Sequence, residues 1–157
     1  MVKQILNYYV KNEYKSVVVD KLFSSYIPDE SMLLENFYLK PQQIKEMQEM
    51  GMVIGSHTIS HPVLSKLTYQ EQLDEIKNSF LYLESITGGS EIIKTFCFPY
   101  GGFHSFNQDT INILQDENVH FSFNVEQRDI NENDIINQKQ NLPRYDCNQF
   151  IFGQVRN

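Results

Sequence analysis

The spacing of apolar residues predicts helices in the first third of the chain. These residues recur three and four positions apart, as they do on one face of a helix. They are Ile5, Leu6, Tyr9, Val10, Val18, Val19, Leu22 and Phe23. We therefore expect a helical lead-in over residues 1–36. Within this part, the Ser, Pro and Asp residues between positions 24 and 38 favour a turn and a loop.

A further helix and a short strand are predicted next. Pro41 suits the first position of a helix, and Gly51 is placed to end it. The apolar run at residues 52–54 is too short for a helix and stops at a glycine, so we expect a buried strand there.

Two more strands alternate with two helices. Residues 92–98 form a second apolar run, and residues 119–125 alternate apolar with polar side chains, as a strand does. Thr68 and Glu71 form a capping box that opens one helix, and another helix starts near Asn107. This alternation predicts an α/β fold with parallel strands and crossover helices.

Functional side chains in such folds lie on the loops that follow the carboxyl ends of the strands. His57 and His61 follow the first predicted strand, and Tyr100 follows the second. The later stretch of residues 126–140 is polar and is predicted to be a loop.

Composition and charge narrow the functional classes. The chain has 157 residues, 41% hydrophobic and 21% charged, which suits one globular domain. Its net charge of -7 argues against a nucleic-acid binder. No apolar run approaches the roughly 20 residues of a membrane span, and no signal segment follows Met1. We therefore expect a soluble, cytoplasmic protein. Cys97 and Cys147 are expected to be reduced and buried.

The pair His57 and His61 is the strongest candidate for chemistry. Two imidazoles four residues apart can reach one metal ion if the segment is helical or tightly looped. Pro62 disfavours a helix at His61, so we expect a loop that leads into a helical turn. No Glu follows His57, which excludes the zincin motif. The alternative is a polar loop with two partly exposed histidines.

The turn at residues 98–102 is a second candidate. Pro99 fixes the backbone and Gly101 permits a sharp bend, so the backbone N–H of Tyr100 can serve as an oxyanion donor. The alternative is an ordinary turn at a strand end.

Near the C-terminus, Arg144 and Asp146 can orient a metal ligand or a catalytic base. The alternative is a weak surface ion pair. His120, which alternates with apolar residues, can face a pocket or a polar surface.

With these residues in view, the sequence resembles the polysaccharide deacetylase family, the NodB-homology carbohydrate esterases. Residues 52–62 are similar to its metal-binding His-(Ser/Thr)-x-x-His motif, and residues 64–76 to the linker and helix that follow it. Residues 96–102 are similar to the motif that forms one wall of the substrate groove. The likeness extends over residues 37–152.

The resemblance implies a partial or distorted (β/α) barrel and the removal of acetyl groups from an acetylated sugar, with a divalent metal ion, usually zinc. It implies that His57 and His61 are metal ligands and that Thr58 braces their loop. The backbone N–H of Tyr100 would help to hold the oxyanion, and Pro99, Tyr100 and Gly101 would contact the substrate. The chemistry is sensible, since a metal ion polarises the acetyl carbonyl and activates water.

The chain departs from the family at its start. The family's Thr-Phe-Asp-Asp-Gly motif, which supplies the base and the third metal ligand, has no counterpart upstream of His57. We therefore expect one deacetylase-like domain over residues 1–157, either incomplete at its N-terminus or degenerate, with little or no activity in the chain as given. The alternative is a non-catalytic carbohydrate-binding or assembly protein of the same fold. A small metal-storage or sensor protein is poorly supported, because it would need more ligands.

Overall fold

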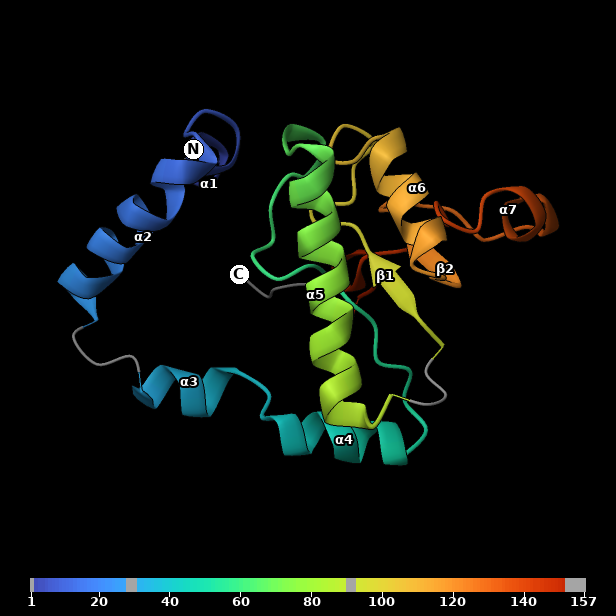
Figure 1. Cartoon of the computed structure of the whole chain (residues 1–157), viewed down its shortest axis with the longest axis horizontal. Coiled ribbons are helices and arrows are strands. Elements are labelled where there is room, and N and C mark those ends of the chain that lie inside the picture. Colours follow the sequence, from blue (N-terminus) through green and yellow to red (C-terminus); the bar gives the residue numbers. More distant parts are fainter. Residues whose placement is uncertain (1, 28–30, 90–92, 152–157) are drawn as a thin grey trace. The chain divides into compact units, whose positions relative to one another are not determined.

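The computed structural model describes residues 2–27, 31–89 and 93–151 (Figure 1). The chain divides into two compact units, Met1–Gln43 and Ile44–Asn157. No helix within the described residues is long and apolar enough to cross a membrane.

The N-terminal unit holds the predicted helices α1 (Val2–Tyr8) and α2 (Asn12–Tyr26) and a further helix, α3 (Ser31–Phe37). The prediction of a loop over residues 24–38 is wrong where α3 forms. Its sequence Ser-Met-Leu-Leu-Glu-Asn-Phe is rich in good helix formers, which outweigh the polar residues that precede it.

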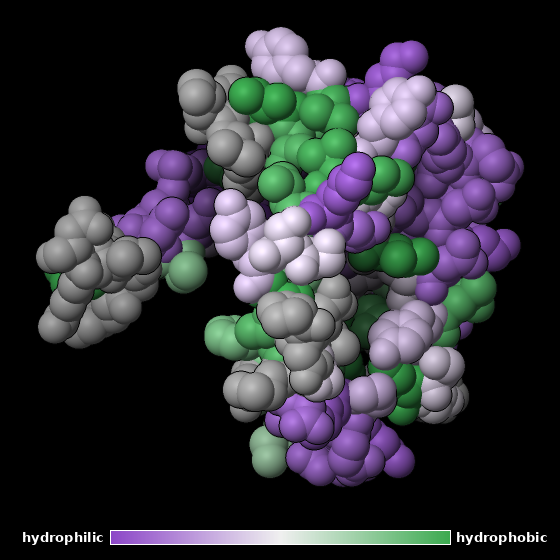
Figure 2. Space-filling model, turned by 90° about the vertical axis from the view of Figure 1, so that its left-hand side faces the viewer, coloured by the Kyte–Doolittle hydropathy of each residue, from purple (hydrophilic) through white to green (hydrophobic). Residues whose placement is uncertain are grey.

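Apolar side chains of the N-terminal unit are largely exposed. Of the side chains that the structure describes in residues 5–43, none is buried, and Val17 on α2 is 58% exposed. Hydrophobic residues lie at the surface on the face shown in Figure 2. The helical spacing thus predicts α1 and α2 correctly, but the apolar residues that show this spacing do not form a buried core.

The C-terminal unit is built on a parallel strand pair. Strand β1 (Thr95–Cys97) pairs with β2 (Phe121–Phe123), with Phe96 opposite Ser122. Helix α6 (Gln108–Asp116) makes the crossover between them; it starts near Asn107, as predicted, and Asn107 caps it. This arrangement confirms a parallel sheet with a crossover helix, whereas a closed barrel is not formed by the elements that the structure describes.

Isolated parallel bridges extend the strand pair on both sides. Ser56 bridges to Phe96 of β1, and Leu142 bridges to Phe123 of β2. Four chain segments therefore run parallel, in the order Ser56, β1, β2, Leu142.

The strand predicted at residues 52–54 is wrong. Met52 and Val53 are 50% and 61% exposed, and the backbone joins β1 only at Ser56, whose N–H donates to the carbonyl of Thr95 at 2.8 Å. The close approach is made at Gly55, where a Cβ atom would collide with Thr95. The apolar run therefore ends before the sheet begins.

Polar side chains occupy the buried face of β2. Ser122 and Asn124 are fully buried, whereas Phe121 and Phe123 are half-buried. Ser122 Oγ donates to the side-chain oxygen of Gln140, and Asn124 Nδ2 donates to the side-chain oxygen of Asn141 at 2.8 Å. Because these side chains are hydrogen-bonded to each other, their burial leaves none of the paired polar atoms without a partner.

The core lies between β1 and two helices. These two helices are α6 and the long helix α5 (Tyr69–Thr87), which begins at the predicted capping box. Helix α4 (Pro41–Glu49) comes before the sheet in the sequence. Helices α5 and α6 pack together (Figure 1). The buried apolar residues of this core are Leu64, Ile76, Phe80, Phe96, Phe98, Phe106, Ile113, Leu114 and Val119.

A short helix, α7 (Glu132–Asn137), lies inside the stretch predicted as a loop, so that prediction is wrong in part. Asn131 caps α7 by accepting from the N–H of Asp134 at 3.1 Å. Arg128 binds both carboxylate oxygens of Asp134, at 2.6 and 2.8 Å. These hydrogen bonds, and not an apolar stripe, hold the helix start.

The remaining elements are two turns of 3-10 helix, η1 (Leu64–Lys66) and η2 (Cys147–Gln149). Both cysteines are free, as expected. Cys97 is only half-buried and Cys147 is exposed on η2, so the prediction of buried thiols is wrong for Cys147. The reason is that η2 is a surface turn in which no residue is buried.

Candidate functional site

His57 is oriented by the strand beside it. Its Nδ1 lies 2.7 Å from the carbonyl oxygen of Cys97, at the end of β1. A carbonyl can only accept, so Nδ1 carries a proton, and in the neutral ring the lone pair is on Nε2. This is the arrangement that second-sphere carbonyls impose on metal-binding histidines.

Three aromatic rings from two loops lie in a row. The rings of His57 and His61 are 4.8 Å apart between centroids, and those of His61 and Tyr100 are 4.7 Å apart, both edge to face. The Tyr100 hydroxyl donates to the backbone carbonyl of His61 at 3.4 Å. The fold therefore brings together three residues that sequence analysis singled out from separate segments.

The histidine loop has an unusual backbone. Thr58 and His61 take positive φ values of 68° and 56°, and Tyr100 takes 64°. Such values are uncommon for residues with a Cβ and are often concentrated at functional sites. Thr58 Oγ1 accepts from the N–H of His61 at 3.1 Å, which fits the bracing role that the resemblance implies. The 3-10 turn η1 follows, as expected of a loop that leads into a helical turn.

Glu75 on α5 holds the same loop, and sequence analysis gave it no role. Its carboxylate accepts from the N–H groups of Ile59 and Ser60, at 2.8 and 2.9 Å, and from the Ser60 hydroxyl at 2.6 Å. Ser60 and Glu75 are 15 positions apart, and no sequence pattern predicts a contact over this separation. The contact becomes visible only in the tertiary structure, where α5 packs beside the loop.

The turn after β1 is fixed by its packing. Pro99 and Gly101 are buried, and the N–H of Val125 donates to the carbonyl of Gly101 at 3.2 Å. Gly101 takes a φ of 65°, and a Cβ there would collide with Val125. The turn therefore needs glycine at this position, and it fixes the position of the Tyr100 ring beside His61.

Arg144 and Asp146 form a loose pair. Arg144 Nε lies 3.8 Å from Asp146 Oδ1, and the side chains are 32% and 47% exposed. Within the described residues, the Nε atom is buried without a hydrogen bond. Among the described residues, neither side chain has a hydrogen bond or ion pair with His57. Partial burial of Tyr145 between them raises its pKa, and the carboxylate of Asp129 adds to this effect.

His120 is exposed and directly precedes β2. It lines a cavity at the opposite end of the strands from the ring cluster. In the part of the chain that the structure describes, no group of three or more His, Cys, Asp or Glu side chains is placed to hold a metal ion.

Comparison with known proteins adds two findings. A family model described as polysaccharide deacetylase matches residues 7–122. Among solved structures, the chain is similar to the Streptococcus pyogenes deacetylase PplD in complex with acetate, with a TM-score of 0.62 and 24% identity. The similarity covers 74% of this chain and 48% of that one, so this chain spans about half the length of its structural neighbour. No curated protein matches the chain.

Proposed function

The chain belongs to the polysaccharide deacetylase family, and from this premise we propose that it carries the histidine part of a metal-dependent site that removes acetyl groups from N- or O-acetylated sugars. The observation that carries the proposal is the His57–His61–Tyr100 ring cluster, with its centroid distances of 4.8 and 4.7 Å. We also propose that the four parallel segments belong to the distorted barrel expected of the family.

In this proposal, the two histidines would supply part of a zinc site. Zinc takes four ligands in a tetrahedral arrangement, and a catalytic site uses three of them from the protein. In the neutral ring of His57 the Nε2 lone pair is available, and His61 lies beside it. No carboxylate joins them in a group of three within the described residues. The donor set therefore does not fit a complete zinc site.

The residues of the chain itself have separate tasks in this proposal. Glu75 and Thr58 hold the histidine loop. The Tyr100 N–H is the proposed donor to the acetyl oxygen, and the turn with Pro99 and Gly101 is the proposed substrate wall. Arg144 and Asp146 stay proposed as orienting groups. Because the family's Thr-Phe-Asp-Asp-Gly motif, which supplies the base, has no counterpart upstream of His57, we expect little or no turnover by the chain alone.

The test combines zinc titration with an acetate-release assay on N-acetylglucosamine oligomers. We expect weak zinc binding that is lost in His57→Ala and kept in the control His120→Ala, with little acetate release. Absence of zinc binding in the unaltered chain would contradict the metal site. Robust acetate release that disappears in His57→Ala would contradict the expected inactivity and would require a base within this chain.

A non-catalytic carbohydrate-binding role is the second candidate. Phe103 follows the Tyr100 turn and is 61% exposed, so its ring is available to stack on a sugar. Glycan binding that persists with EDTA and weakens in Phe103→Ala would support this role. Glycan binding that EDTA abolishes would count against it.

A further inference from the structure

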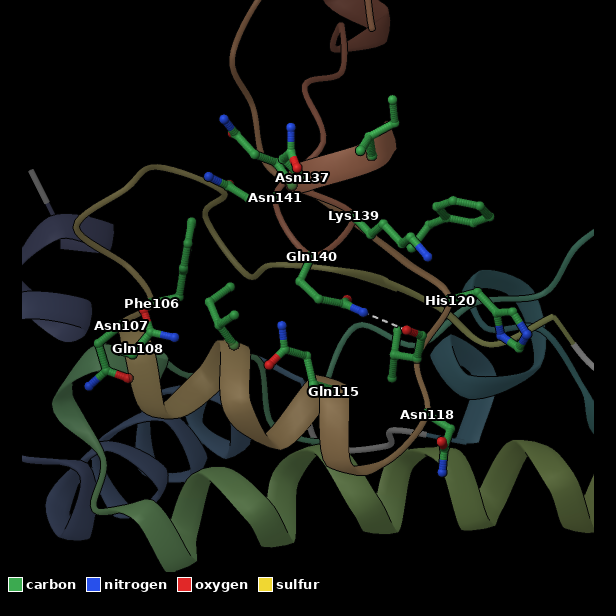
Figure 3. A pocket seen from close by; sticks show the side chains of 15 residues that line it. Phe106, Asn107, Gln108, Gln115, Asn118, His120, Asn137, Lys139, Gln140 and Asn141 are labelled. Carbon is green, nitrogen blue, oxygen red and sulfur yellow. Dashed lines mark hydrogen bonds between the residues drawn. The ribbon is translucent and has the colours of Figure 1, made fainter. Parts of the chain in front are cut away.

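A cavity of about 930 Å³ lies away from the histidine loop, within the C-terminal unit. It is bounded by α6, by the turn that enters β2, and by the segment after α7 (Figure 3). Its volume falls within the roughly 300–1,000 Å³ that is usual for small-molecule sites. It is therefore large enough to take one or more sugar rings.

The cavity lies at the opposite end of the strands from the ring cluster. His57 and Tyr100 lie at the carboxyl ends of the parallel segments, because they follow Ser56 and β1. The cavity is lined by Val119 and His120, which precede β2, and by Phe121, which begins it. The two sites share no lining residue.

The lining chemistry is dominated by amides. More than half of the residues that line the cavity are Asn or Gln, and none is Asp or Glu. An amide side chain offers both donors and an acceptor without a charge, which matches a sugar hydroxyl that donates and accepts. Lys139 is the sole Lys or Arg among the lining residues. The net charge of -7 further disfavours an anionic ligand.

Part of this lining is held in place by its own hydrogen bonds. The side-chain oxygen of Gln140 accepts from Ser122 Oγ, and its nitrogen donates to the carbonyl of Val119, as the dashed line in Figure 3 shows. The side-chain oxygen of Asn141 accepts from Asn124 at 2.8 Å. A rigid polar wall of this kind costs little conformational entropy when a ligand binds.

Other side chains are available to a ligand. Figure 3 shows Gln115 extending from α6 into the cavity. Among the described residues, the side chains of Gln115 and Lys139 have no hydrogen bond or ion pair, and both are exposed. Ile111 and Phe121 are half-buried and line the same space, so they offer an apolar surface to the C–H face of a sugar ring.

We propose that this amide-lined cavity binds an uncharged saccharide, as a carbohydrate subsite separate from the histidine site. The wall of Gln140 and Asn141 fixes the orientation of the sugar, and Gln115 and Lys139 hydrogen-bond its hydroxyls. The subsite goes beyond the proposed hydrolysis, because it needs neither the metal nor the ring cluster.

The test is a titration of the full chain with the N-acetylglucosamine tetramer in EDTA, followed by nuclear magnetic resonance of the backbone and side-chain amides. We expect shifts at Gln115, Gln140 and Asn141. Gln115→Ala and Lys139→Ala should each weaken binding about two- to tenfold, the range that one hydrogen bond supports. Gln70→Ala, on an exposed part of α5, is the matched control and should bind as the unaltered chain does.

Further variants separate the subsite from the proposed active site. Loss of binding in EDTA in His57→Ala or Phe103→Ala would place the sugar at the histidine end of the strands and would overturn the proposal. Shifts confined to the histidine loop, or unchanged affinity in folded Gln115→Ala and Lys139→Ala variants, would overturn the proposal. Tighter binding of an anionic oligosaccharide than of the tetramer would overturn the assignment to an uncharged ligand.

Discussion

Glu75 accepts two hydrogen bonds from Ser60, one from the backbone N–H at 2.9 Å and one from the hydroxyl at 2.6 Å. A third bond comes from the N–H of Ile59. One carboxylate on α5 thus fixes the middle of the loop between His57 and His61. Since Thr58 and His61 both take positive φ values, the loop depends on such partners to keep its conformation.

Replacement of this carboxylate should loosen the histidine pair. Glu75→Gln keeps one acceptor but brings an NH₂ group toward backbone donors, so we expect a loss of about 1–3 kcal/mol in the free energy of unfolding. We also expect weaker zinc binding in a calorimetric titration. Asp74→Asn is the control, because Asp74 directly precedes Glu75 on α5 and is exposed. Unchanged zinc affinity in Glu75→Gln would show that the loop holds its shape without this residue.

Gly101 should tolerate no side chain. In Gly101→Ala, the positive φ costs about 1–2 kcal/mol, and the collision with Val125 adds about 1–3 kcal/mol. Urea unfolding measures the sum. Gly88→Ala is a matched control, because Gly88 also has a positive φ, of 83°, but open space around it. Equal losses in the two variants would contradict the packing of the turn against Val125.

Ser122 should be needed for the buried polar network of β2. Ser122→Ala leaves the side-chain oxygen of Gln140 without its donor, which we expect to cost about 1–3 kcal/mol in the free energy of unfolding. Ser85→Ala changes an exposed serine on α5 and should cost about 0.5 kcal/mol or less. A loss in Ser122→Ala no larger than in Ser85→Ala would argue that Gln140 finds another partner.

Asp134 should make stability depend on pH. Its hydrogen bonds with Arg128, and with the Asn131 backbone, lower its pKa from 3.8 to about 2. A carboxylate whose pKa is lower in the folded state stabilises the fold above its unfolded pKa, and this contribution is lost as the pH falls toward 2.

We expect the urea midpoint of the unaltered chain to fall between pH 4 and pH 2 by more than that of Asp134→Asn. Asp74→Asn, whose carboxylate is exposed, should keep the steeper dependence of the unaltered chain. Parallel pH profiles for the unaltered chain and Asp134→Asn would show that the pair with Arg128 adds no stability.

Local signals predicted the helices well. The capping box of Thr68 and Glu71 identified the start of α5, because capping is decided within one turn of the chain. The sequence also placed the start of α6 near Asn107, and the structure shows that Asn107 caps this helix. By contrast, α7 has no apolar stripe to reveal it, and it depends on Arg128 bonding to Asp134. Strand prediction failed at residues 52–54, because pairing with β1 depends on a partner some 40 positions away, as the bridge from Ser56 to Phe96 shows.

The sequence by itself determined the candidate residues, which are His57, His61 and the turn at Tyr100. It also determined the helices whose ends are marked by local residues. The tertiary structure decided which of them meet. It placed three rings beside one another, paired Arg144 loosely with Asp146, and assigned Glu75 to the loop. The reason is physical: caps and turns depend on neighbours in sequence, whereas contacts between parallel segments depend on how helices pack around the sheet.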